Sequence, residues 1–145
     1  MNIKIINKGL TISLFGISGK VINYQYGETG FKLMDEMWRI VKSENLKHKG
    51  INYWVYDNDQ MMFTGVELYA APPKDVNLEF RNITLTKYVY YKHIGPYWKL
   101  KEANEAVKEE IKKRGLNCHH PSLEIYVHMV EDESKLETEI LYSID

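Results

Sequence analysis

A carboxylate and an aromatic ring stand two residues apart near the end of the chain, at Glu124 and Tyr126. Residues 123–129 alternate apolar side chains with polar or aromatic ones, which predicts a strand. We expect Leu123, Ile125, Val127 and Met129 to face the core under a helix. Glu124 and Tyr126 then share the opposite face with His128. Alternation alone leaves two interpretations of that face: a solvated surface or the floor of a binding site.

Strand 52–56 offers a matching set of side chains. Asn52, Trp54 and Tyr56 alternate onto one face of this predicted strand. Large aromatic rings on two matched faces are unusual unless they surround something. A carboxylate ringed by aromatic side chains is a good receptor for an organic cation, because charge and ring faces both attract it.

The segment 93–98 supplies two more aromatic residues, Tyr97 and Trp98, where a strand meets a helix. Trp98 packs into the core as a hydrophobic staple in one interpretation. In the other, Tyr97 or Trp98 forms a wall of the cleft. Tyr69 and Trp38 complete the predicted ligand-binding residues.

Other chemistries find less support in the sequence. His119 and His120 follow Cys118, but three adjacent residues cannot all face one ion in a regular element, so we predict no metal site and no cofactor. A net charge of −1 without a clustered basic stripe argues against direct nucleic-acid binding. No apolar run is long enough to span a bilayer, and a single cysteine fits a reducing compartment. We therefore expect a cytoplasmic protein.

The order of predicted elements repeats. The residues Ala-Ala-Pro-Pro-Lys-Asp at 70–75 separate two halves, about 1–73 and 74–145. The first half contains strand 3–21, interrupted near residues 7–9, a helix from about Thr29 with that residue as N-cap, and strands 52–56 and 62–70. The second contains strand 78–93, a helix opened by Gly95-Pro96, and strands 123–129 and 138–144.

A shift of 72 residues superposes the two halves and pairs Asn52 with Glu124 and Trp54 with Tyr126. We therefore predict a single α+β domain, 1–145. It consists of duplicated β-α-β-β units related by a pseudo-twofold axis, with antiparallel sheets around a central ligand groove.

Several residues of the second half together resemble the GyrI-like small-molecule-binding domain, the effector-binding domain of BmrR- and Rob-type regulators. They are His93, Gly95, Tyr97, Gly115, Glu124, Tyr126, Asp132, Thr138, Glu139 and Ile140. The resemblance implies a duplicated fold of the SHS2 type with a central groove. It also implies that Glu124 contacts cationic aromatic ligands, with Tyr126 and Tyr97 as the aromatic wall. The chain is too short for an added helix-turn-helix, so it looks like a stand-alone member.

Two functions stay open at this point. The first is binding of small amphipathic, cationic aromatic molecules as a sensor or sink, with a regulatory protein as a further partner. The alternative is a hydrolase of reactive cyclopropyl-type compounds, with Glu124 and Tyr126 as general acid and base. We expect binding rather than catalysis, because a single glutamate without a second positioned base provides few of the groups that general acid–base catalysis needs.

Overall fold

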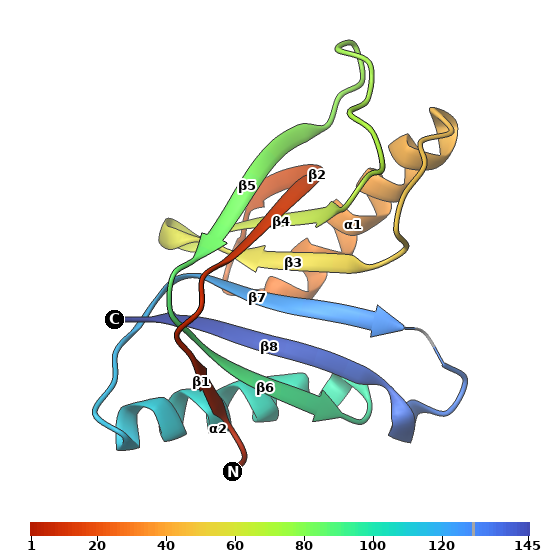
Figure 1. The fold of residues 1–145 in the computed structure, drawn as a ribbon. Helices are drawn as coiled ribbons and strands as arrows, with labels where there is room; N and C mark the ends of the chain where they lie inside the picture. Colours follow the sequence, from red (N-terminus) through yellow and green to blue (C-terminus); the bar gives the residue numbers. More distant parts are fainter. Residues whose placement is uncertain (129) are drawn as a thin grey trace.

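The computed structural model describes residues 1–128 and 130–145, apart from the side chain of His128. The strands in this part of the chain are β1 (Lys4–Ile6), β2 (Leu10–Lys20), β3 (Asn52–Tyr56), β4 (Met61–Val66), β5 (Glu79–Leu85), β6 (Tyr88–Ile94), β7 (Cys118–His128) and β8 (Glu137–Ile144). The helices are α1 (Tyr26–Ser43) and α2 (Leu100–Lys113), with short 3-10 turns η1 (Asn58–Gln60), η2 (Tyr97–Lys99) and η3 (Glu133–Lys135). All the strands pair antiparallel in one eight-stranded sheet (Figure 1).

The order of the strands in the sheet shows the predicted duplication. It runs β1-β6-β8-β7-β3-β4-β2-β5, so the equivalent strands β3 and β7 pair at the centre. Tyr53 of β3 lies opposite Ile125 of β7, and these two residues are 72 apart in sequence. This pairing places the pseudo-twofold axis between them. The α+β fold and its duplication are confirmed, with one continuous sheet in place of separate ones.

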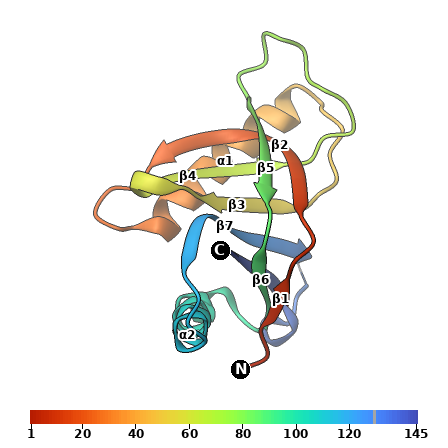
Figure 2. The ribbon, with the colours of Figure 1, turned by 60° about the vertical axis from the view of Figure 1, so that its left-hand side comes forward.

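Each half also lends a strand to the other half. β1 pairs with β6, and β5 pairs with β2, so the segments β1–β2 and β5–β6 run side by side across both halves. Figure 2 shows β5 and β6 upright, with β1 and the first part of β2 beside them, whereas β3, β4 and β7 run crosswise. The sheet curls, because side chains of β2 and β5 pack against those of β3, β4, β7 and β8 in one apolar cluster.

That cluster corrects the predicted direction of the last long strand. Leu123 and Ile125 are buried in it beside Leu14, Phe63 and Leu85, without a contribution from either helix. Their neighbours on β7 therefore face the helices, and the expectation that Leu123 and Ile125 lie under a helix is wrong. The alternation itself was correct. Val127 is partly buried against the same cluster, whereas Met129 lies outside the described residues.

The helices cover the other face of the sheet. α1 packs through Met37 and Val41 against Val66 of β4. α2 packs through Val107 and Ile111 against strands β6 and β8. Both helices are strongly amphipathic, which is the reason these segments fold onto a sheet. No helix among the described residues is long and apolar enough to cross a membrane.

Several predicted boundaries shift. The strand expected over 78–93 is divided into β5, which pairs with β2 of the first half, and β6, which pairs with β8 of the second half. The strand expected to reach residue 70 ends at Val66. α1 starts at Tyr26 with Gln25 at its N-cap position, so Thr29 is not the cap. Pro96 precedes the 3-10 turn η2, and α2 begins only at Leu100.

Gly16 marks a place where the sheet tolerates no side chain. It lies opposite Gly65 in the β2–β4 pairing, and a Cβ built on it would stand 1.9 Å from the carbonyl oxygen of Thr64. The Gly16→Ala variant should therefore lose about 1–3 kcal/mol of unfolding free energy, because backbone atoms must move to admit the methyl group. Urea denaturation followed by circular dichroism measures this loss.

The control is Gly9→Ala, since a Cβ there meets only Leu85 O at an ordinary 3.7 Å. Equal stabilities of the two variants would contradict the close packing of β2 on β4.

Candidate ligand-binding site

A cavity of about 930 Å³ opens between the two helices. Its floor is formed by β3 and β7, with α1 on one side and α2 on the other. The antiparallel register places Trp54 opposite Glu124, Asn52 opposite Tyr126 and Tyr56 opposite Ser122. Because side chains two residues apart share a face, these residues all turn toward the helices. Pairing of the central strands thus brings together the two sets that the sequence matched.

Glu124 is the charged group of this floor. Its side chain is only 5% exposed, and it accepts hydrogen bonds from three neutral side chains. The hydroxyls of Tyr56 and Tyr126 donate to Oε1, the latter over 3.0 Å, and Nδ2 of Asn104 donates to Oε2 over 2.9 Å. Among the described residues, no lysine, arginine or histidine lies within ion-pair distance of Glu124. The buried negative charge is therefore hydrogen-bonded but lacks a protein counter-charge.

Asn104 connects this carboxylate to α2. Its Nδ2 also donates to the carbonyl oxygen of Leu100 over 2.9 Å, and its Oδ1 accepts from the hydroxyl of Tyr142 over 2.6 Å. The amide is thereby fixed in one orientation, with its NH₂ toward Glu124. Sequence analysis missed Asn104. The available signal was a polar residue adjoining the apolar stripe of Leu100, Ala103, Val107 and Ile111.

The tyrosines act as donors. Burial and the neighbouring Glu124 carboxylate raise the pKa of the Tyr56 and Tyr126 hydroxyls well above their usual value. Burial likewise raises the pKa of Tyr142. All three hydroxyls therefore keep their protons at neutral pH and act as neutral donors in the network around Glu124.

Aromatic rings surround the carboxylate. Tyr126 lies edge-to-face against both Tyr97 and Trp54, with ring centroids 5.3 Å apart in each pair. Phe31 of α1 lies 5.2 Å from Trp54 and Tyr26 lies 5.8 Å from Tyr56. Such tilted and edge-to-face contacts keep part of each ring face available to another group. Phe31 and Tyr26 were not predicted as site residues.

A glycine of α1 makes room for Trp54. A Cβ built on Gly30 would stand 2.3 Å from the indole ring, so only glycine permits this close contact between helix and floor. The benzo edge of the indole packs here, through the atoms Cε3, Cζ3 and Cη2.

The remaining predicted site residues occupy different places. Trp98 is 73% exposed and borders the cavity mouth, so its interpretation as a core staple is wrong. Trp38 donates from Nε1 to Oδ1 of Asn52 over 2.6 Å and packs against His48. Tyr69 is 71% exposed beside Lys49. Among the described residues that line the cavity, neither Trp38 nor Tyr69 appears.

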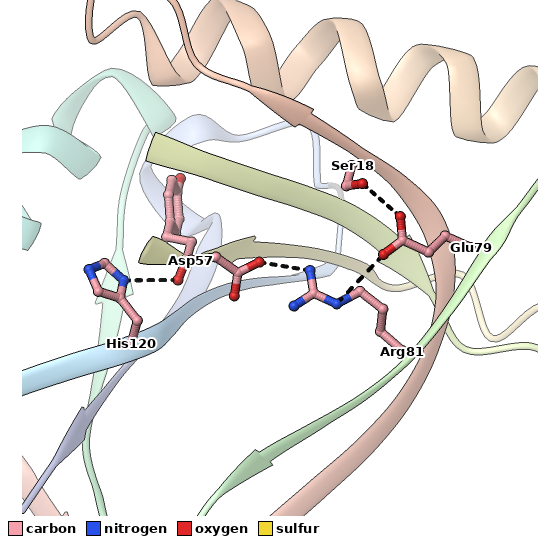
Figure 3. A network of polar contacts seen from close by, with 6 residues as sticks. Ser18, Asp57, Glu79, Arg81 and His120 are labelled. Atoms are coloured by element: carbon pink, nitrogen blue, oxygen red, sulfur yellow. Dashed lines mark hydrogen bonds and ion pairs between the residues drawn. The ribbon is translucent and has the colours of Figure 1, made fainter. Parts of the chain in front are cut away.

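A second carboxylate at the cavity, Asp57, is already paired. Arg81 of β5 bridges Asp57 over 2.7 Å and approaches Glu79, which accepts from the hydroxyl of Ser18 (Figure 3). The ring of His120 hydrogen-bonds the carbonyl oxygen of Tyr56 over 3.2 Å (Figure 3). This network anchors the end of β3 and neutralises Asp57. Within the described part of the chain, no cluster of histidine, cysteine and carboxylate side chains is arranged to hold a metal ion.

Comparison with family models finds no match to this sequence, and comparison with curated proteins finds none either. Solved structures, by contrast, share the whole architecture. The C-terminal domain of EcmrR is 18% identical with a TM-score of 0.75, and the match covers 100% of this chain and 99% of that one. SAV2435 bound to tetraphenylphosphonium is 20% identical with a TM-score of 0.67, covering 100% and 94%.

A third structure, described as a putative bacterial transcription regulation protein from Staphylococcus aureus, is 17% identical with a TM-score of 0.64 and covers 100% and 99% of the two chains. At these identities the likeness concerns the fold. The chain therefore has the GyrI-like fold that its second half resembled in sequence.

Proposed function

We propose that this protein binds small, amphipathic organic cations, aromatic ones in particular, in the cavity between α1 and α2. The observation that carries the proposal is Glu124, a buried carboxylate on the cavity floor that no described cationic side chain pairs. SAV2435, which has the same fold, is bound to tetraphenylphosphonium in its structure, and this supports a cation as the ligand here.

The physical match lies in how such a cation would be held. A quaternary phosphonium has no N–H or O–H group, so recognition depends on charge and on ring contacts. A unit charge 4 Å from Glu124 gains about 4 kcal/mol at an effective dielectric constant of about 20. Each ring that faces the cation adds roughly 0.5–2 kcal/mol, and Tyr126, Trp54 and Tyr97 are placed to do so.

In the cell we propose that the protein serves as a sensor or sink for such compounds in the cytoplasm. A sensor passes its signal to a regulatory protein partner, whereas a sink needs none.

Removing the charge of Glu124 should weaken cation binding. We expect Glu124→Gln to bind tetraphenylphosphonium about ten- to a hundredfold more weakly than the wild type, because the counter-charge of the cation is lost while the side chain keeps its shape. Isothermal titration calorimetry with tetraphenylphosphonium measures the difference.

Glu139→Gln is the matched control. Glu139 also accepts a tyrosine hydroxyl, that of Tyr90, but it does not border the cavity. This variant should bind like the wild type. Unchanged affinity in Glu124→Gln, or an equal loss in both variants, would refute the role of Glu124 as counter-charge.

A change to the aromatic wall should also weaken binding, though less than loss of the charge. In Gly30→Ala, the new methyl group must push Trp54 off α1 and into the cavity. We expect tetraphenylphosphonium binding to weaken severalfold, although alanine favours the helix by about 0.5–1 kcal/mol. Calorimetric titration tests the first effect and thermal unfolding the second. Lys32→Ala, an exposed change on the same helix away from the cavity, should leave binding intact. Wild-type affinity in Gly30→Ala would contradict a binding role for Trp54.

Hydrolysis at the same site is the competing function. Glu124 already accepts hydrogen bonds from three donors, and the two tyrosines among them hold their protons tightly. We therefore expect an electrophilic cyclopropane to be hydrated no faster with the wild type than with Glu124→Gln, as followed by mass spectrometry. Turnover that depends on Glu124 would favour the hydrolase instead.

A further inference from the structure

We propose that the ligand of this cavity is a monocation that also carries a hydrogen-bond acceptor, such as a carbonyl oxygen, which reaches β3 while the positive charge lies at Glu124. Asn52 and Trp54 of β3 form the subsite that donates hydrogen bonds to this acceptor. The inference rests on the proposed function and names the chemical class of the ligand more closely.

The side-chain amide of Asn52 is held in one orientation by Trp38. The indole N–H of Trp38 can only donate, and it lies 2.6 Å from Oδ1 of Asn52. The oxygen of the amide is therefore engaged and the NH₂ group points elsewhere. Asn52 borders the cavity, and the described part of the chain offers no acceptor to its Nδ2. Asn52 thus presents donors to the cavity, and Trp38 is the positioning residue that keeps them there.

Trp54 provides a second donor. Its side chain is 4% exposed, and Nε1 has no hydrogen-bond partner among the described residues. The benzo edge of the indole packs against Gly30, so Nε1 lies on the side of the ring away from α1. A buried N–H without an acceptor destabilises a protein unless something supplies one. Because Nε1 itself is closed to solvent, an acceptor on the ligand would do so after a small shift of the indole.

The β3–β7 register places Asn52 and Glu124 at different points of the cavity floor. Trp54 lies directly opposite Glu124, whereas Asn52 lies opposite Tyr126 and hence diagonal to Glu124. Diagonal neighbours in an antiparallel pair have backbones about 7–8 Å apart, so the side chains of Asn52 and Glu124 start from separate points of the cavity floor. A cation held at Glu124 would place an acceptor on Asn52 only if the charge and the acceptor lie at different ends of the ligand. A second positive charge there would meet donors, which disfavours dications.

A pair of matched probes tests the inference. (4-Acetylphenyl)triphenylphosphonium and (4-isopropylphenyl)triphenylphosphonium have the same charge and nearly the same shape, but only the first has an acceptor oxygen. We expect the wild type to bind the acetyl compound roughly three- to tenfold more tightly, the size of one net hydrogen bond. Calorimetric titration of both probes gives the affinity ratio.

Variants then locate the acceptor subsite. In Asn52→Leu and Trp54→Phe the ratio should fall toward one, while the isopropyl compound still binds. Trp38→Phe removes no group that borders the cavity, yet it should lower the ratio because the Asn52 amide is free to turn. Asn82→Leu is the control, since Asn82 is an exposed residue of β5 that bonds Ser13 away from the cavity, and it should keep the wild-type ratio. The two tryptophan variants keep the test decisive if Asn52→Leu does not fold.

The failures are distinguishable. Equal affinities of the wild type for both probes, or an acetyl preference that survives in Asn52→Leu and Trp54→Phe, would overturn the acceptor subsite and leave cation binding standing. Absence of binding by both probes would overturn the proposed function and this inference together.

Discussion

Burial of the Glu124 carboxylate is the constraint on which the rest of the site depends. A buried charge is strongly destabilising unless hydrogen bonds or an opposite charge compensate it. Here the compensation comes from β3, β7 and α2, through Tyr56, Tyr126 and Asn104. The helix and the two central strands are therefore connected through one carboxylate, with the tyrosines on Oε1 and Asn104 on Oε2. The described part of the fold supplies neutral donors and no opposite charge, and in the proposed function the ligand brings that charge.

The duplication explains where the cavity lies. Pairing β3 with β7 on the pseudo-twofold axis puts equivalent strands at the centre and one helix on each side, so the groove between the helices crosses the axis. The chemistry breaks the symmetry. Asn52 stands where the second half has Glu124, and its partner is Trp38 of α1. The floor of the groove thus has one charged end and one neutral end, and in the proposed function this difference would give a bound molecule a direction.

How far the sequence predicted the site can be judged from particular residues. Alternation identified the shared face of Glu124 and Tyr126, and the 72-residue shift found the matching face of Trp54 and Tyr56. Neither pattern told which face of β7 meets the helices. Both faces of β7 are covered, one by the curled sheet and one by the helices, so the apolar pattern of Leu123 and Ile125 fitted either. Only the long strands that cross between the halves decide the matter.

Sequence by itself determined the order of elements, their duplication and the alternation along the strands, because these depend on local periodicity and residue type. It favoured Glu124 as a site residue only through the matched aromatic side chains and the family resemblance. The tertiary structure decided which side chains complete the site. Asn104 and Tyr142 come from α2 and β8, far from Glu124 along the chain, and only packing brings them within hydrogen-bond distance. The same holds for Gly30 beneath Trp54 and for Trp38 beside Asn52. Contacts between elements depend on how helices seat on the sheet, and no pattern within a single element contains that information.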